Sequence, residues 1–228
     1  MHETIADRFT NIFDKIQAAC LQAQRSQDDV KIVAVSKLQS IEVIKDAYAL
    51  GIKNFGENYA QELAEKSSAS PNDIIWHFIG PIQSNKVSLI AKHADWVHSL
   101  DREKVAKKLN EVLDAEGKKI NTLIQVNIDK EESKSGVHPD DVIDFAKSLN
   151  EHYSNLILRG LMFMPKINAS KKAKIDTMKN VMNLQKLLIS ELPSCKSLSL
   201  GTSGDFEESI IAGSTIIRIG ESLLGKRL

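Results

Sequence analysis

Short runs of β-branched and aliphatic residues recur along the chain, separated by segments with a helical period. The runs predict strands at 31–36, 53–56, 76–80, 96–100, 120–127, 157–164, 197–201 and 215–220. Most of them are continuously apolar rather than alternating, which is typical of parallel strands covered by helices on both faces. The pattern therefore predicts an α/β fold built on a parallel sheet.

The segments between these runs have apolar residues at helical spacing, for example Val105, Leu109, Val112 and Leu113 after the fourth run. Parallel strands need such crossovers. Eight strand–helix units favour a (β/α)8 barrel, also called a TIM barrel, in which functional residues gather at the C-terminal ends of the strands. An open doubly wound sheet is the alternative, because the pattern does not prove closure.

An amphipathic helix is predicted ahead of the first strand, packed on the outside of the barrel or across its floor. Its apolar residues recur at spacings of three and four: Ile5, Phe9, Ile12, Phe13, Ile16 and Cys20. Several helix ends are also legible. Ser40 is expected as an N-cap, Gly51 as a left-handed C-terminal residue, and Asp205 as an N-cap that forms a capping box with Glu208.

Composition indicates a globular protein, with 42% hydrophobic and 26% charged residues over 228 positions. No linker or repeat divides the chain, so residues 1–228 are expected to form a single domain. The 30 basic and 30 acidic side chains balance, which argues against nucleic acid or an anionic membrane as partner. The first residues lack a signal-peptide pattern, so a cytoplasmic location is expected. Cys20 and Cys195 are expected as buried thiols rather than metal ligands.

A lysine follows the first strand, at the predicted mouth of the barrel. Lys37 follows the apolar stretch at 32–35, with Ser36 between them. Apolar surroundings lower the pKa of a lysine and free its amine for imine formation. Lys37 is therefore a candidate nucleophile, although a solvated lysine at a strand end is the simpler interpretation. Other residues at the same ends of the strands are Asn58, Gly80, Ser99, Asn127 and Met164.

A phosphate-binding turn is predicted after the seventh strand. Gly201, Thr202 and Ser203 precede a short helix, so backbone N–H groups and two hydroxyls could hold a phosphate there. The loops after strands seven and eight are the usual phosphate site of this fold. A plain Gly/Ser turn is the alternative.

Two polar side chains interrupt apolar strands. Arg218 lies in the eighth strand, and its guanidinium needs either a core carboxylate or a ligand as partner. His77 lies in the third strand and is expected as a core histidine without a catalytic role.

A lysine nucleophile, a phosphate turn and a strand arginine together indicate a phosphorylated carbonyl ligand, either pyridoxal 5′-phosphate (PLP) or the sugar phosphate of a Schiff-base aldolase.

Six ordered motifs decide between these ligands. The chain resembles the YggS/PROSC family of PLP homeostasis proteins in AVSK (34–37), FGENYAQEL (55–63), WHFIGPIQSNK (76–86), NIDKEESKSG (127–136), RGLMFMP (159–165) and RIGESLLG (218–225). The resemblance runs nearly end to end. One difference is that the family usually has Met-Gly-Met-Ser where this chain has Leu200, Gly201, Thr202 and Ser203, and Phe206 replaces a further methionine.

The resemblance implies a barrel similar to the N-terminal domain of alanine racemase, with PLP held as an aldimine on Lys37. It further implies that residues 201–203 and the backbone around Ile219 and Gly220 hold the phosphate, that Arg218 faces the pyridine nitrogen, and that Asn58 lies near the ring. Members of the family resemble cofactor carriers or buffers without established catalysis. PLP-dependent apo-enzymes are possible recipients, and a monomer is expected.

An amino-acid racemase is the second functional interpretation, and the aldolase is the third. Racemisation needs a base on each face of the α-carbon, and the segment after the eighth strand is too short to supply the domain that carries the second base in barrel-type racemases. A guanidinium with a pKa above about 12 gives its proton reluctantly to the pyridine nitrogen, so the ring is a poor electron sink. Both arguments favour the carrier.

Overall fold

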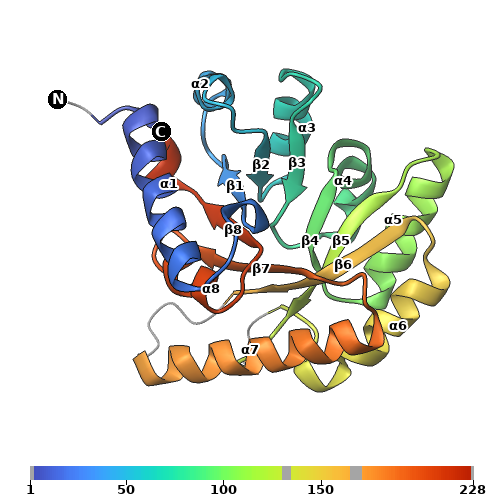
Figure 1. The fold of residues 1–228 in the computed structure, drawn as a ribbon. Coiled ribbons are helices and arrows are strands. Elements are labelled where there is room, and N and C mark those ends of the chain that lie inside the picture. The colour runs from blue at the N-terminus through green and yellow to red at the C-terminus, as the bar shows by residue number, and fades with distance from the viewer. Residues whose placement is uncertain (1–2, 130–134, 165–170, 227–228) are drawn as a thin grey trace.

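A computed structural model describes residues 3–129, 135–164 and 171–226 of the chain. Its eight strands are all parallel and form a closed barrel in chain order (Figure 1). They are β1 (Lys31–Val35), β2 (Asn54–Glu57), β3 (Ile75–Phe78), β4 (Trp96–Leu100), β5 (Ile120–Val126), β6 (Leu156–Phe163), β7 (Ser197–Thr202) and β8 (Ile216–Ile219). The predicted strands agree with these to within one or two residues at either end.

Pairing of the first and last strands closes the sheet. Lys31 of β1 lies opposite Ile216 of β8, and the register continues to the pair Ala34 and Ile219. This pairing confirms the barrel and excludes the open doubly wound sheet. Closure places all eight C-terminal strand ends on one rim, where a (β/α)8 barrel presents its functional residues.

The crossover helices form because each has one apolar face. α5 (Glu103–Ala115), for example, buries Val105, Leu109 and Leu113 against the barrel, as the spacing predicts. The other helices are α2 (Ile41–Ala49), α3 (Ala60–Ser68), α4 (Val87–His93), α6 (Val142–His152), α7 (Lys171–Glu191), α8 (Phe206–Ile211) and α9 (Glu221–Leu224). Three 3-10 turns accompany them: η1 (Gln27–Asp29), η2 (Ser84–Lys86) and η3 (Pro139–Asp141).

The predicted N-terminal helix is α1 (Ile5–Gln22), which lies outside the barrel beside the C-terminal end of the chain (Figure 1). It packs against α8 and α9, and its residues Ile12, Ile16 and Cys20 are buried. Thr4 caps it in a reciprocal capping box with Asp7. No helix in the described part of the chain combines the length and apolar character needed to cross a bilayer.

The predicted helix ends agree with the structure in part. Gly51 follows α2 with a φ of 90°, the left-handed conformation expected there. Ser40 occupies the N-cap position of α2, but its side chain makes no capping hydrogen bond.

Cys20 and Cys195 are both buried free thiols, as expected, and burial raises the pKa of each.

Candidate functional site

The predicted functional side chains gather around one cavity of about 350 Å³ at the C-terminal ends of the strands. We call it the strand-end cavity. It is lined by Val35, Lys37, Asn58, Ile79, Met164, Thr202, Ser203, Arg218, Gly220 and Glu221. The structure therefore brings together six of the eight residues proposed from the sequence. The other two, Gly201 and Ile219, are buried next to lining residues and do not line the cavity themselves.

Lys37 sits in a sharp turn directly after β1. Its neighbour Leu38 has a φ of 59°, a left-handed conformation that is unfavourable for a residue with a branched side chain. The backbone N–H of Leu38 donates a 2.8 Å hydrogen bond to Oε2 of Glu62 on α3. Strained backbone of this kind persists where surrounding structure enforces it. The turn thus holds the Lys37 side chain at the cavity.

A buried ionic cluster fixes the backbone at Ser36, the residue before Lys37. Lys66 of α3 donates to the carbonyl oxygen of Ser36 at 2.8 Å, to Glu57 at 2.9 Å and to Glu62 at 2.6 Å. Ser36 donates its hydroxyl to the same oxygen of Glu57. Burial raises the pKa of Glu57, while the Lys66 and Ser36 hydrogen bonds oppose the shift.

This cluster was missed by sequence reasoning, although FGENYAQEL contains two of its members. The available signal was the spacing of four between Glu62 and Lys66, which places both side chains on one face of α3. The burial of that face, however, depends on where α3 packs. A solvent-exposed pair with the same spacing would look identical in sequence.

Asn58 lines the cavity and has one unsatisfied polar atom. Its Oδ1 is buried and accepts no hydrogen bond within the described residues. Buried polar atoms are nearly always paired, so such an atom at a cavity wall fits a bound ligand. Gly80 allows the chain to pass this close, because a Cβ there would lie 2.1 Å from the carbonyl oxygen of Asn58.

The turn after β7 differs from the expected capping box. Asp205 occupies the N-cap position of α8, but its Oδ1 accepts hydrogen bonds from Thr202, 2.7 Å from the backbone N and 2.9 Å from Oγ1, and makes no capping bond to the helix. The expectation of a box with Glu208 was therefore wrong, because the turn folds back and brings Thr202 closer. Thr202 lines the cavity, but its two donors are already used by Asp205.

Ser203 and Gly204 are the parts of this turn that fit an anion. Ser203 Oγ accepts a hydrogen bond of 3.4 Å from the backbone N–H of Gly220, which joins the loops after β7 and β8. Gly204 donates no backbone hydrogen bond within the described residues, and an added Cβ at that position would meet nothing within 4 Å. A backbone N–H without an acceptor beside a hydroxyl is a suitable contact for a phosphate oxygen.

Arg218 has neutral partners rather than a carboxylate. Its Nη1 donates to Ser199 Oγ, and its Nη2 donates to the carbonyl oxygen of Phe163 at 2.9 Å. It forms no salt bridge with any described carboxylate, although Asp205 acts on it at longer range. Burial lowers the pKa of Arg218 to about 10, below the value above 12 expected from sequence. The guanidinium is nevertheless charged at neutral pH, and it lines the cavity.

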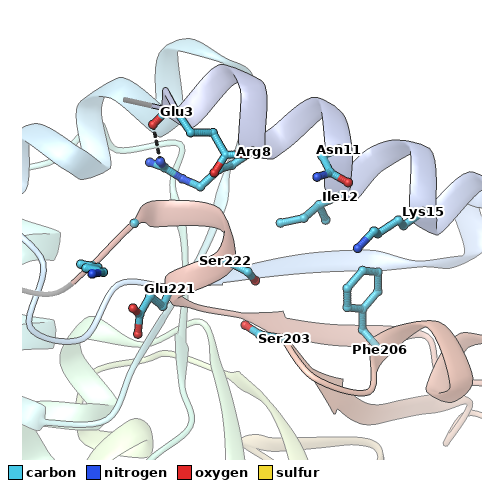
Figure 2. Close-up of a pocket in the computed structure, with 11 residues that line it drawn as sticks. Glu3, Arg8, Asn11, Ile12, Lys15, Ser203, Phe206, Glu221 and Ser222 are labelled. Atoms are coloured by element: carbon cyan, nitrogen blue, oxygen red, sulfur yellow. Dashed lines mark hydrogen bonds between the residues drawn. The ribbon is translucent and has the colours of Figure 1, made fainter. Parts of the chain in front are cut away.

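A second and larger cavity of about 790 Å³ adjoins this site and shares Ser203 and Glu221 with it. Figure 2 shows Arg8, Asn11 and Lys15 of α1 on one side, facing Ser203, Phe206 and the start of α9. Charges of both signs line it, including Glu3 and Glu221. It contains no strand-end lysine, so the smaller strand-end cavity is the better candidate for imine chemistry.

Two of the six sequence motifs extend beyond the described residues. Positions 130–134 of the fifth-strand motif and position 165 of the sixth-strand motif lie outside them. Met164, the last described residue before that gap, is exposed and lines the strand-end cavity.

Comparison with known proteins gives consistent matches over nearly the whole chain. The family model for the alanine racemase N-terminal domain matches residues 13–227. The pyridoxal phosphate homeostasis protein of Pasteurella multocida is 41% identical over 229 residues, covering 98% of each chain. The Escherichia coli K12 protein of the same name is 38% identical over 227 residues, covering 98% of this chain and 97% of the other.

Among solved structures, PipY of Synechococcus elongatus, determined with PLP bound, matches with a TM-score of 0.81 and 29% identity, covering 97% of this chain and all (100%) of the other. Alanine racemase of Clostridium difficile matches with a TM-score of 0.72 at 16% identity, over 92% of this chain and 56% of the other, which shows the shared fold alone. The chain therefore belongs to the alanine racemase N-terminal domain family and, within it, to the pyridoxal phosphate homeostasis proteins.

Proposed function

We propose that this protein binds PLP in the strand-end cavity, covalently through the amine of Lys37. The observation that carries the proposal is that a single cavity is lined by a strand-end lysine, a buried cationic Arg218 and Ser203 of the turn after β7. PLP supplies an aldehyde that condenses with an amine, a pyridine ring and a phosphate. Each of these groups has a matching element in the cavity, and PipY, a relative of the same fold, holds PLP.

The residues divide the recognition among them. Ser203, Gly204 and the backbone at Ile219 and Gly220 hold the phosphate, whose charge of about −1.5 to −2 favours N–H and hydroxyl donors. Gly201 shapes the turn, and Thr202 restrains it through Asp205. These assignments combine the family resemblance with the donors that the turn leaves open.

The ring contacts involve Arg218 and Asn58, the two remaining residues predicted from the sequence. Arg218 directs its charge toward the pyridine nitrogen, and Asn58 contacts the ring region. The buried Oδ1 of Asn58, which lacks a partner within the described residues, supports a polar ligand at this wall. Val35 and Ile79 supply the apolar part of the lining.

We further propose that the protein carries or buffers PLP without turnover, acts as a monomer in the cytoplasm and hands PLP to apo-enzymes. The relatives' name supports a role in homeostasis rather than in a defined reaction. The charge of Arg218 supports it as well, because a pKa of about 10 keeps the guanidinium protonated at pH 7 and leaves the pyridine nitrogen without a ready proton. Such a ring stabilises a carbanion poorly.

Borohydride reduction tests the assignment of Lys37. Protein incubated with PLP is expected to show a visible absorption band, and reduction followed by peptide mapping should place the phosphopyridoxyl label on Lys37. Lys37→Ala should lose both the band and the label. Lys92→Ala, which removes an exposed lysine of α4, is the matched control and should retain both. Recovery of the label mainly on another lysine of the wild-type protein would contradict the proposal.

A further inference from the structure

A continuous chain of hydrogen bonds runs through the barrel interior from Arg218 to the opposite end of the barrel. Arg218 donates to Ser199 Oγ, Ser199 lies 3.0 Å from Nδ1 of His98, Nε2 of His98 lies 2.9 Å from Nδ1 of His77, and Nε2 of His77 lies 3.0 Å from Oδ1 of Asn54. His98 belongs to β4 and Ser199 to β7, which are not neighbours in the sheet, so the chain crosses the interior.

The chain has only one polarity that satisfies its members. A guanidinium donates and never accepts, so Ser199 Oγ is an acceptor toward Arg218. The Ser199 hydroxyl is fully buried, and within the described residues its only possible acceptor is Nδ1 of His98. His98 must then carry its proton on Nε2 and donate to Nδ1 of His77. His77 likewise carries its proton on Nε2 and donates to Oδ1 of Asn54.

The opposite polarity would leave the buried Ser199 hydroxyl without an acceptor, which is costly. The fixed donor at Arg218 therefore determines both histidine tautomers. Both rings are completely buried, and burial lowers the pKa of His77 to about 3 and that of His98 well below its ordinary value. Both imidazoles are thus neutral at neutral pH and able to accept on one nitrogen and donate from the other.

This polarity also suits the buried charge. Every member of the chain presents its lone pair toward Arg218 and its hydrogen away from it, so the dipoles align with the cation. Hydrogen bonds arranged in this way strengthen one another in a low-dielectric interior. They help to explain how a guanidinium only 5% exposed is held without a described carboxylate at salt-bridge distance.

We propose that Ser199, His98 and His77 are positioning residues for the cofactor site, which hold the Arg218 guanidinium in the strand-end cavity through a one-directional hydrogen-bond chain with both histidines protonated on Nε2. The proposal rests on the proposed function for its consequence, because Arg218 is the group that faces the cofactor ring. The tautomers are a property of the barrel alone and are measurable without PLP.

Nitrogen-15 NMR of the uniformly labelled apoprotein at neutral pH tests the chain directly. The signals of His77 and His98 are assigned by their loss in His77→Gln and His98→Gln. Both rings are expected to be neutral and protonated on Nε2. A proton on Nδ1 of either ring, or a charged imidazolium, would overturn the proposal, and this holds even where PLP binding fails.

Substitution of the hydroxyl that links Arg218 to His98 tests the consequence for the cofactor. Ser199→Ala is expected to weaken PLP binding about tenfold or more, which corresponds to about 1.4 kcal/mol. It should also shift the absorption maximum of bound PLP, because the contact between the guanidinium and the ring changes. Loss of stability alone would not shift that maximum.

Ser67→Ala is the matched control. It removes a serine that lies 2.8 Å from Nδ1 of His93 on the outside of the barrel, and it should leave affinity and spectrum unchanged. Wild-type affinity and an unshifted spectrum in Ser199→Ala would overturn the positioning role. If Ser199→Ala does not fold, the histidine tautomers measured in the wild-type apoprotein decide whether the proposed hydrogen-bond chain is correct. Absence of PLP from the wild type would refute the proposed function separately.

Discussion

Adjacent residues in the turn after β7 have different roles. Thr202 directs both of its donors to Asp205 and so holds the turn together. Ser203 faces the loop after β8 through Gly220. Thr202 therefore serves the shape of the turn, and under the proposed function the anion contact falls to its neighbours.

A negative charge at Ser203 should therefore weaken PLP binding selectively. In Ser203→Asp the carboxylate would face the phosphate, and repulsion between like charges follows. A ligand that binds only the folded state adds about 2.7 kcal/mol at a hundred times its Kd, so PLP should raise the Tm of the wild-type apoprotein more than that of the variant. Differential scanning fluorimetry with and without PLP measures both shifts.

Ser222→Asp is the matched control for this change. Ser222 lines only the larger neighbouring cavity and is exposed, so the same charge there should reduce the PLP-induced shift far less. Equal thermal shifts in wild type and Ser203→Asp would remove Ser203 from the site.

Two glycines in the β7–α8 connection have opposite requirements. Gly201 has a φ of 102°, and a Cβ there would lie 2.8 Å from Cβ of Ser209 on α8. The helix can pack closely on the strand end only because position 201 lacks a side chain. Gly204, three residues later, faces open space. The connection thus combines a sterically required glycine with one at which a side chain would meet no neighbour.

Alanine substitutions should separate these roles. Gly201→Ala is expected to lower the free energy of unfolding by about 1–3 kcal/mol, because it combines an unfavourable left-handed backbone with a close contact. Gly204→Ala should change stability by less than about 0.5 kcal/mol. Urea denaturation of the two apoproteins compares them, and a stability of Gly201→Ala equal to that of wild type would contradict the steric argument.

α3 acts as a brace for the turn that carries Lys37. Lys66 and Glu62 of this helix hold Ser36 and Leu38, the two residues on either side of the lysine, through hydrogen bonds of 2.8 Å each. A helix that packs outside the barrel therefore controls the position of a side chain inside its mouth.

The barrel as a whole keeps two histidines neutral, and this property has a consequence for its stability in acid. The unfolded chain binds protons on its histidines near their ordinary pKa of 6.5, whereas burial lowers the pKa of His77 in the folded barrel to about 3 and lowers that of His98 strongly. Between these pH values the unfolded state binds more protons. The free energy of unfolding therefore falls as the pH drops below about 6.5.

Each such histidine contributes a slope of up to about 1.4 kcal/mol per pH unit. His77→Gln removes one of them, so the decline in its free energy of unfolding between about pH 6 and pH 4.5 should be shallower than in wild type by an amount of this order. Denaturation curves at several pH values measure the slopes. Parallel curves for the two proteins would show that His77 takes up no proton on unfolding.

Much of the fold was predictable because its signals are local. Continuous apolar runs, helical spacing and turn residues such as Gly51 depend on neighbours a few positions away, and they gave the strands, the crossover helices and the N-terminal helix. The rim position of Lys37 and Arg218 followed from the same pattern. Closure of the sheet was not determined, because it depends on pairing between β1 and β8, whose residues are far apart in the chain.

The partners of the functional residues were decided only by the tertiary structure. Sequence predicted that Arg218 needs a partner, but one such partner is Ser199 of β7, which in turn contacts His98 of β4, 101 positions away in the chain. The capping box was wrong for a related reason: several acceptors and donors compete in a short turn, and the backbone path chose Thr202 for Asp205. Local pattern fixes which element a residue belongs to, whereas hydrogen-bond partners depend on distances that exist only after the barrel has closed.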